Sequence, residues 1–151
     1  MVYHLAAFYS TRPQDAAQLY EVNVGGTERL LQAAAAAGVR RFVHTSTIGT
    51  VGRPPDGRPA TEEYPFRDSE AASPYVRSKA QAEQRALAAA EAGLPVVVVN
   101  PCAPVGARDR TPSSTGARIL AVLQGRVPSF PRGGINFVPV VDVARGHLLA
   151  A

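Results

Sequence analysis

The chain has 151 residues, of which 46% are hydrophobic and 19% charged, which suits one globular domain with a sizeable core and excludes a disordered or fibrous protein. The formal net charge is +4, but the arginines are scattered and only Arg40 and Arg41 are adjacent, so we expect no nucleic-acid partner. The single cysteine cannot form an internal disulfide, and neither a secretory signal nor a run of about 18 apolar residues is present, so we expect a cytoplasmic protein without membrane insertion.

The first half of the chain alternates between strand and helix patterns. Residues 2–8 form a short apolar run typical of a buried strand, and over 13–37 apolar and small side chains recur at helical spacing. Gly38 follows where a helix end favours a left-handed residue, and residues 40–46 resume a buried-strand pattern. Residues 52–72 are polar and rich in proline and glycine, which predicts a long surface loop.

The second half continues this alternation. Ser73 is a good N-cap, Pro74 suits the first helical position, and residues 75–92 are mostly strong helix formers, followed by Gly93. The remaining elements are predicted as a central parallel strand at 94–101, a helix at 114–125, a short strand at 136–140 and a helix that starts within 142–151. This order predicts an α/β protein, a doubly wound parallel sheet with helices on both faces.

Lys79, the only lysine in the chain, lies four residues after Tyr75, so both side chains share one face of the predicted helix. Tyr75 falls in the first turn, where the helix dipole favours a phenolate, and we expect the nearby ammonium to lower the tyrosine pKa toward the range of a general acid or base. A compact ammonium fits beneath a phenol better than a planar guanidinium. A surface helix with one tyrosine and one lysine is the alternative.

Three hydroxyl side chains, Thr45, Ser46 and Thr47, end the second predicted strand. The carboxyl ends of parallel strands form the sheet edge at which ligands of such folds bind. These residues are therefore candidates for ligand contact, with turn formation as the alternative.

The other reactive residues favour neither thiol nor metal chemistry. Cys102 has no evident histidine partner and sits in a proline-flanked position that suits a packed loop. His4, His44 and His147 lack the spacing of metal ligands. We assign no metal site.

Taken together, these segments resemble the extended short-chain dehydrogenase/reductase family of NAD-dependent epimerases, dehydratases and reductases, and the match runs nearly end to end. The segments that resemble its fourth strand, its fourth helix and fifth strand, its catalytic helix, and its sixth strand with the following loop are VYHLAA (2–7), NVGGTERLLQAAAAAGVRRFVHTST (23–47), SPYVRSKAQAE (73–83) and VVVVNPCAPVGARD (96–109). Within the family the chain is most similar to hopanoid-associated sugar epimerases, followed by dihydroflavonol reductases.

The resemblance implies a division of the chain. Residues 1–110 would form the second half of a Rossmann-like nucleotide-binding domain, and 111–151 the beginning of a substrate-binding region that returns to the sheet. The chain contains neither G-x-G-x-x-G nor G-x-x-x-x-G-K-[ST], so the glycine-rich turn that holds the cofactor pyrophosphate in such folds is missing.

The resemblance also implies roles for individual residues. Tyr75 would transfer a proton, Lys79 would hold the nicotinamide ribose, and Thr47 would bind the reacting substrate oxygen. Asn100 would also contact substrate, whereas for Asn23 a structural hydrogen bond is favoured over substrate contact. Besides Tyr75 and Lys79, the implied cofactor contacts are Ala6, Ala7, Thr45, Ser46, Pro101 and Cys102.

The activity implied is that of an NAD- or NADP-dependent enzyme that acts on a hydroxyl or carbonyl carbon of a sugar derivative or similar small molecule. Where relatives commonly read HVDDVA, residues 139–144 read PVVDVA, which leaves substrate handling open. The alternatives are a non-catalytic cofactor-binding or regulatory protein on the same scaffold and a truncated fragment, and we expect the chain alone to be inactive. The family also suggests a homodimer through the helices around 14–37 and 74–92.

Overall fold

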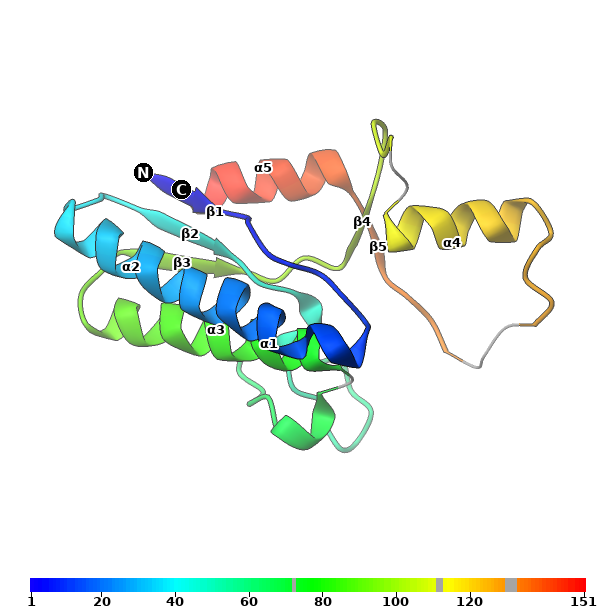
Figure 1. Ribbon diagram of the computed structural model, residues 1–151, viewed down its shortest axis with the longest axis horizontal. Coiled ribbons are helices and arrows are strands. Elements are labelled where there is room, and N and C mark those ends of the chain that lie inside the picture. Colours follow the sequence, from blue (N-terminus) through cyan, green and yellow to red (C-terminus); the bar gives the residue numbers. More distant parts are fainter. Residues whose placement is uncertain (72, 111–112, 130–132) are drawn as a thin grey trace.

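A three-stranded parallel sheet lies between two layers of helices (Figure 1). The computed structural model describes residues 1–71, 73–110, 113–129 and 133–151. The strands lie in the order β1 (Val2–His4), β2 (Phe42–Thr45) and β3 (Val96–Val99). Phe42 of the central strand pairs with Val2 on one side and Val96 on the other. The predicted parallel α/β sheet is confirmed.

Two long helices cover one face of this sheet (Figure 1). The first runs through α1 (Ala16–Leu19), a π-helical turn (Tyr20–Gly25) and α2 (Gly26–Ala36), and the second is α3 (Pro74–Glu91). The predicted cap of α3 is present, because the Ser73 hydroxyl accepts a hydrogen bond from Val76 N at 3.3 Å. The core between these helices and β2 consists of Leu31, Ala34, Phe42, Ala86 and Leu94.

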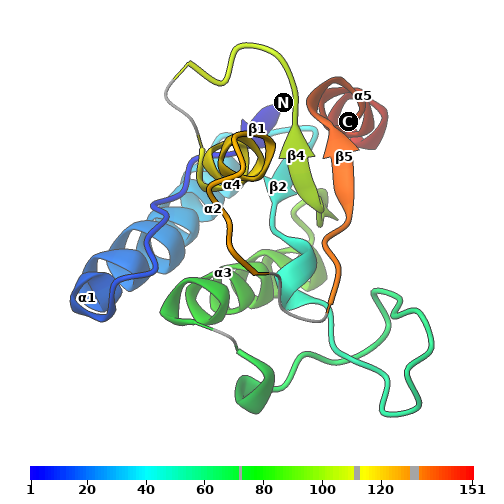
Figure 2. The same ribbon diagram turned by 90° about the vertical axis from the view of Figure 1, so that its right-hand side faces the viewer.

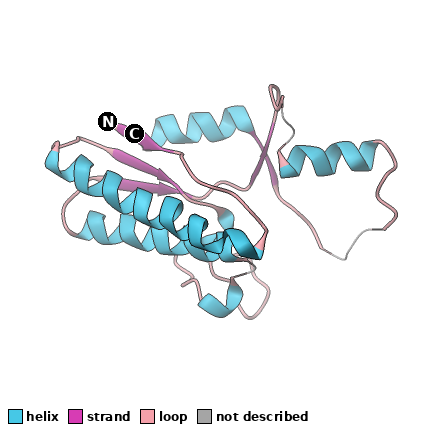
Figure 3. Ribbon diagram, in the orientation of Figure 1, coloured by secondary structure: helices cyan, strands magenta, loops and turns pink. Residues whose placement is uncertain are grey.

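The last helix, α5 (Val140–Ala150), covers the opposite face of the sheet (Figure 1). It follows a second parallel sheet of two strands, β4 (Ala103–Val105) and β5 (Phe137–Pro139). Beside that pair lies α4 (Ser114–Leu123), which projects away from the other helices (Figure 3). None of the helices in the described part of the chain has the length and apolar character needed to cross a bilayer.

Several boundaries differ from the predicted ones. β1 ends at His4 instead of continuing to residue 8, because Asn23 binds the backbone of Phe8 and draws the chain away from the sheet. α4 ends at Leu123, and α5 starts at Val140, two residues before the predicted start. Most of the predicted loop at 52–72 is irregular, with one short 3-10 helix (Asp68–Glu70), and residue 72 lies outside the described residues.

Candidate active site

The carboxyl ends of β2 and β3 form a continuous edge that extends beyond the strands themselves. Ser46 N donates to Val99 O at 2.8 Å, and Ile48 N donates to Pro101 O at 3.0 Å. The predicted hydroxyl residues therefore lie at the edge where ligands bind in open α/β sheets. Pro101 and the free Cys102 follow β3 at the same edge, and both are half-buried.

Lys79 reaches this edge from α3. Its ammonium donates to Thr45 O at 2.7 Å, and its side chain is buried. Arg41 O accepts from Val2 N, and carbonyls two residues apart on a strand point to the same side, so Thr45 O points to the β1 side as well. Since β1 has already ended at His4, Lys79 supplies the donor that a longer β1 would have supplied.

Burial lowers the pKa of Lys79 to about 8, although the Glu83 carboxylate one turn further along α3 acts in the opposite direction. The ammonium is therefore mostly charged at neutral pH and close to its titration midpoint. A group in this state can both bind a hydroxyl and respond to a neighbouring proton transfer.

Tyr75 lies in the first turn of α3 and is half-buried. Its ring and that of Tyr9 form a T-shaped pair, with centroids 4.8 Å apart and planes at 73°. Burial raises the pKa of Tyr75, and Tyr9 raises it further. The expectation of a pKa lowered by Lys79 is therefore wrong for the chain as it stands, because burial of the phenol dominates. At neutral pH Tyr75 carries its proton and can donate it.

Thr47 is held on a short 3-10 helix (Ile48–Thr50) whose first turn it caps, since its hydroxyl accepts from Gly49 N at 3.3 Å. This turn packs against the first turn of α3: a methyl group on Gly49 would lie 3.4 Å from Val76 Cγ2, in ordinary contact. The fold thus brings the Thr47 turn against the helix turn that carries Tyr75.

A network of hydrogen bonds connects the Thr47 turn to Asn100 and to Glu83 of α3. The Asn100 amide group donates to Thr47 O at 3.3 Å, to Thr50 Oγ1 at 2.9 Å and to Glu83 Oε2 at 3.0 Å. Thr50 Oγ1 donates to Glu83 Oε2 at 2.6 Å, and the buried Ser46 hydroxyl lies 3.3 Å from Thr50 Oγ1. Asn100 and Ser46 thus have structural partners, and their contacts with substrate or cofactor stay predictions.

Asn23 ties the segment after β1 to α3. Its Oδ1 accepts from Phe8 N at 2.7 Å, and its Nδ2 donates to Phe8 O at 3.0 Å and to Ser78 Oγ at 2.9 Å. Ser78 Oγ in turn donates to Tyr75 O at 2.8 Å. The structural interpretation of Asn23 is confirmed. Ala6 and Ala7, the predicted cofactor contacts, are exposed in the segment that this clamp positions.

Two of the histidines, His4 and His44, are buried beside the site. Thr27 Oγ1 donates to Asn23 O at 2.6 Å, so His4 Nε2, 2.8 Å from the same hydroxyl, carries the proton of that contact. His44 is completely buried, and burial together with the positive charge of Lys79 lowers its pKa to about 3, which keeps it neutral. Within the described ranges no three His, Cys, Asp or Glu side chains are placed to hold a metal ion.

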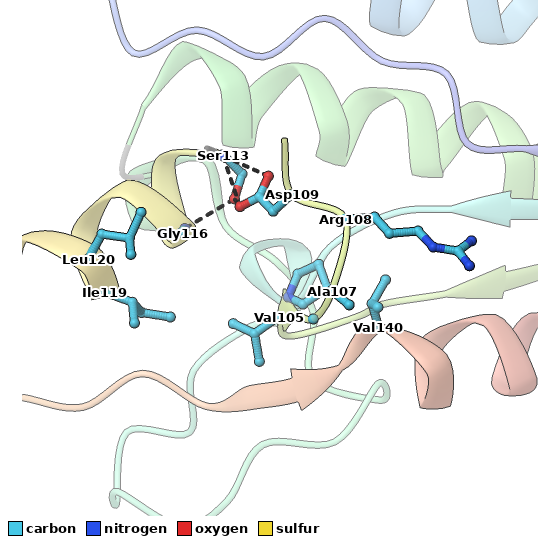
Figure 4. Close-up of a pocket in the computed structure, with 11 residues that line it drawn as sticks. Val105, Ala107, Arg108, Asp109, Ser113, Gly116, Ile119, Leu120 and Val140 are labelled. Atoms are coloured by element: carbon cyan, nitrogen blue, oxygen red, sulfur yellow. Dashed lines mark hydrogen bonds between the residues drawn. The ribbon is translucent and has the colours of Figure 1, made fainter. Parts of the chain in front are cut away.

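A groove of about 700 Å³ lies apart from these residues, between α4 and the β4–β5 pair. Figure 4 shows Ile119 and Leu120 of α4 on one side and Val105 and Val140 on the other. The Asp109 carboxylate accepts from Ser113 N at 2.9 Å and orders the start of α4. Thr47, Tyr75 and Lys79 do not line the groove, whose lining residues lie on both sides of the predicted domain boundary at residue 110.

Three contributors to the site were missed by the reasoning from sequence. Tyr9 falls in no motif, and His147, whose ring bonds the Thr45 hydroxyl, is 102 residues away from it in the chain. Glu83 could have been found, because it lies four residues after Lys79 on the same helix face.

Comparison with known proteins places this chain in a family. The family model described as "NAD dependent epimerase/dehydratase family" matches residues 1–151. The protein named "Putative dihydroflavonol 4-reductase" from Synechocystis is 42% identical over 99% of this chain and 43% of its own length. "Sterol demethylase protein B" from Methylococcus capsulatus is 44% identical over 99% of this chain and 45% of its own length.

A solved structure has a similar fold. "MoeE5 in complex with UDP-glucose and NAD" has a TM-score of 0.80 and 30% sequence identity, covering 99% of this chain and 51% of that chain. The chain spans less than half the length of the two curated relatives. Because the family model matches residues 1–151, the chain belongs to the NAD dependent epimerase/dehydratase family.

Proposed function

We propose that this chain carries the proton-transfer part of the active site of an NAD- or NADP-dependent enzyme acting on a hydroxyl or carbonyl carbon of a small molecule. The observation that carries the proposal is the position of Lys79, whose ammonium is buried at the end of β2, one helical turn after Tyr75. Burying an ammonium costs free energy unless its charge is paired or hydrogen-bonded. At this edge of the sheet the Lys79 ammonium faces the place where a cofactor binds in such folds.

The residues present fit the nicotinamide half of such a cofactor. An ammonium has three N–H donors, and Thr45 O takes one of them, so two can serve a ribose. Ala6 and Ala7 offer small, exposed side chains beside the strand ends. When bound, the cofactor would supply or accept hydride.

In this proposal the chain's own residues hold the substrate and move the proton. Tyr75, protonated at neutral pH, donates its proton to a substrate carbonyl oxygen or, in the reverse direction, takes it back. Lys79 stabilises the phenolate that remains, and Thr47 orients the reacting oxygen. We propose a sugar derivative or a similar small molecule as the substrate. The cytoplasmic location of the protein also stays a proposal.

The 151-residue chain alone is expected to be inactive, because its sequence lacks the glycine-rich turn for the pyrophosphate. The homodimer through the long helices also stays a proposal. Leu30 and Leu87, which are 42% and 48% exposed, form apolar surface on those helices that a second copy of the chain would cover.

The test is a chimera in which this chain replaces the matched region of the Synechocystis relative, assayed with NADH and NADPH against carbonyl compounds and nucleotide sugars. We expect turnover in the chimera and a loss of at least about 100-fold in kcat for Tyr75→Phe, with cofactor binding retained. Tyr3→Phe is the matched control and should turn over normally. Unchanged turnover in Tyr75→Phe would remove the proton-transfer role, and cofactor binding without any turnover would favour a non-catalytic protein.

A further inference from the structure

We propose that His147 is a positioning residue for Lys79, acting through Thr45, which both side chains contact from opposite faces of the sheet. Figure 2 shows α3, which carries Lys79, and α5, which carries His147, on opposite sides of β2. The geometric part of this inference is independent of any activity, whereas its catalytic consequence rests on the proposed function.

Thr45 is the shared partner. Its hydroxyl lies 2.7 Å from His147 Nε2, and its carbonyl accepts from Lys79 Nζ at 2.7 Å. His147 and Lys79 are each only 4% exposed. Each contact thus has one partner that is almost completely buried, and loss of the contact would leave that partner's polar group unpaired.

The directions of the hydrogen bonds follow from the acceptors. His147 Nδ1 lies 2.8 Å from Val143 O, and because a carbonyl only accepts, Nδ1 carries the proton. In the neutral form of the imidazole, Nε2 is then the acceptor and the Thr45 hydroxyl donates to it. This fixes both the tautomer of the imidazole and the side-chain rotamer of Thr45.

The fixed rotamer matters because β1 does not hold the Thr45 carbonyl. The Thr45–Ser46 peptide is bonded to β3 through Ser46 N, which donates to Val99 O, while its carbonyl points past the end of β1. Only Lys79 is bonded to that carbonyl among the contacts of the described residues. His147 thus supplies from α5 part of the restraint that a paired strand would otherwise supply.

The helix that carries His147 also borders the groove. Val140, at the start of α5, lines the groove beside α4, and His147 lies seven residues, or two turns, further along. One helix therefore lines the groove at one end and, near the other end, connects to the ammonium through Thr45.

Lys79 offers a direct measurement, because it is the only lysine in the chain. Its rate of reductive methylation, followed on its own peptide by mass spectrometry, reports how firmly the ammonium is held and requires no cofactor or substrate. We expect this rate to rise severalfold in Thr45→Val and in His147→Leu. It should stay at the wild-type value in Thr45→Ser, which keeps the hydroxyl, and in His147→Gln, whose amide oxygen can accept.

Thr27→Val is the matched stability control, since it removes another buried threonine–histidine contact, that with His4 at 2.8 Å. Its methylation rate at Lys79 should stay at the wild-type value even if its melting temperature falls. Equal rates in His147→Leu and wild type, or an equal rise in Thr27→Val, would overturn the proposal. If Thr45→Val does not fold, the His147→Leu and His147→Gln pair decides.

In an active chimera, His147→Leu should lower kcat and leave KM unchanged, and an inactive chimera leaves the methylation test standing.

Discussion

Deprotonation of Lys79 should stabilise the folded protein. Its pKa is about 8 in the fold against an ordinary value of 10.5, because its ammonium is removed from water. Between these two pH values the unfolded chain binds more protons than the folded one, so the free energy of unfolding rises with pH. A difference of 2.5 pKa units (10.5 minus 8) at 1.36 kcal/mol per unit gives about 3 kcal/mol for this buried group.

The assay has two parts. In protein grown with 13Cε-labelled lysine, one side-chain NMR signal should titrate with a midpoint near pH 8. Urea unfolding at a series of pH values should then show the rise in stability for wild type and a smaller rise for Lys79→Met, in which the titrating group is absent. The difference between the two curves isolates Lys79 from the tyrosines. A midpoint near 10.5, or parallel stability curves, would refute the reasoning.

Three further changes test separate contacts. Glu83→Gln keeps the shape of the side chain but removes its charge, so the NMR midpoint of the buried ammonium should fall below that of wild type. Asn23→Ala leaves the Phe8 backbone without its partners and should lower the urea-unfolding free energy by about 2–3 kcal/mol. Gly52→Ala places a methyl carbon 2.3 Å from the Pro65 backbone oxygen and should lower the free energy of unfolding by about 1–3 kcal/mol. The control Gly26→Ala, whose methyl group would enter open space, should stabilise the protein slightly. Equal effects of the two changes would contradict the close approach of the chain at Gly52.

Local patterns account for the elements that the sequence predicted well. The four valines of β3 and the Ser73-Pro74 start of α3 depend on neighbours in the chain, and both elements are present where expected. β1 was predicted too long, because residues 5–8 are apolar enough for a strand, whereas the backbone of Phe8 is bonded to Asn23 instead of to a strand. Local sequence cannot show such a competition between distant partners.

The candidate site divides in the same way. The spacing of Tyr75 and Lys79 on one helix face is a local property and could be predicted, but the sign of the Tyr75 pKa shift could not, since it depends on burial and on Tyr9. The His147–Thr45 contact joins residues 102 positions apart, and no motif signals it. Resemblance to a family supplied the proposed roles of the residues, while the structure supplied the contacts that these residues make.

The π-helical turn at Tyr20–Gly25 changes how the first long helix should be probed. In a regular α-helix, Leu19 and Leu31 would be separated by twelve steps of about 100°, and would point about 120° apart. Both are nevertheless buried, at 0% and 5% exposure, because the wide turn takes up about one residue and restores the phase. An alanine scan across this helix should therefore show two periodic patterns of sensitivity, offset by one residue on either side of Asn23.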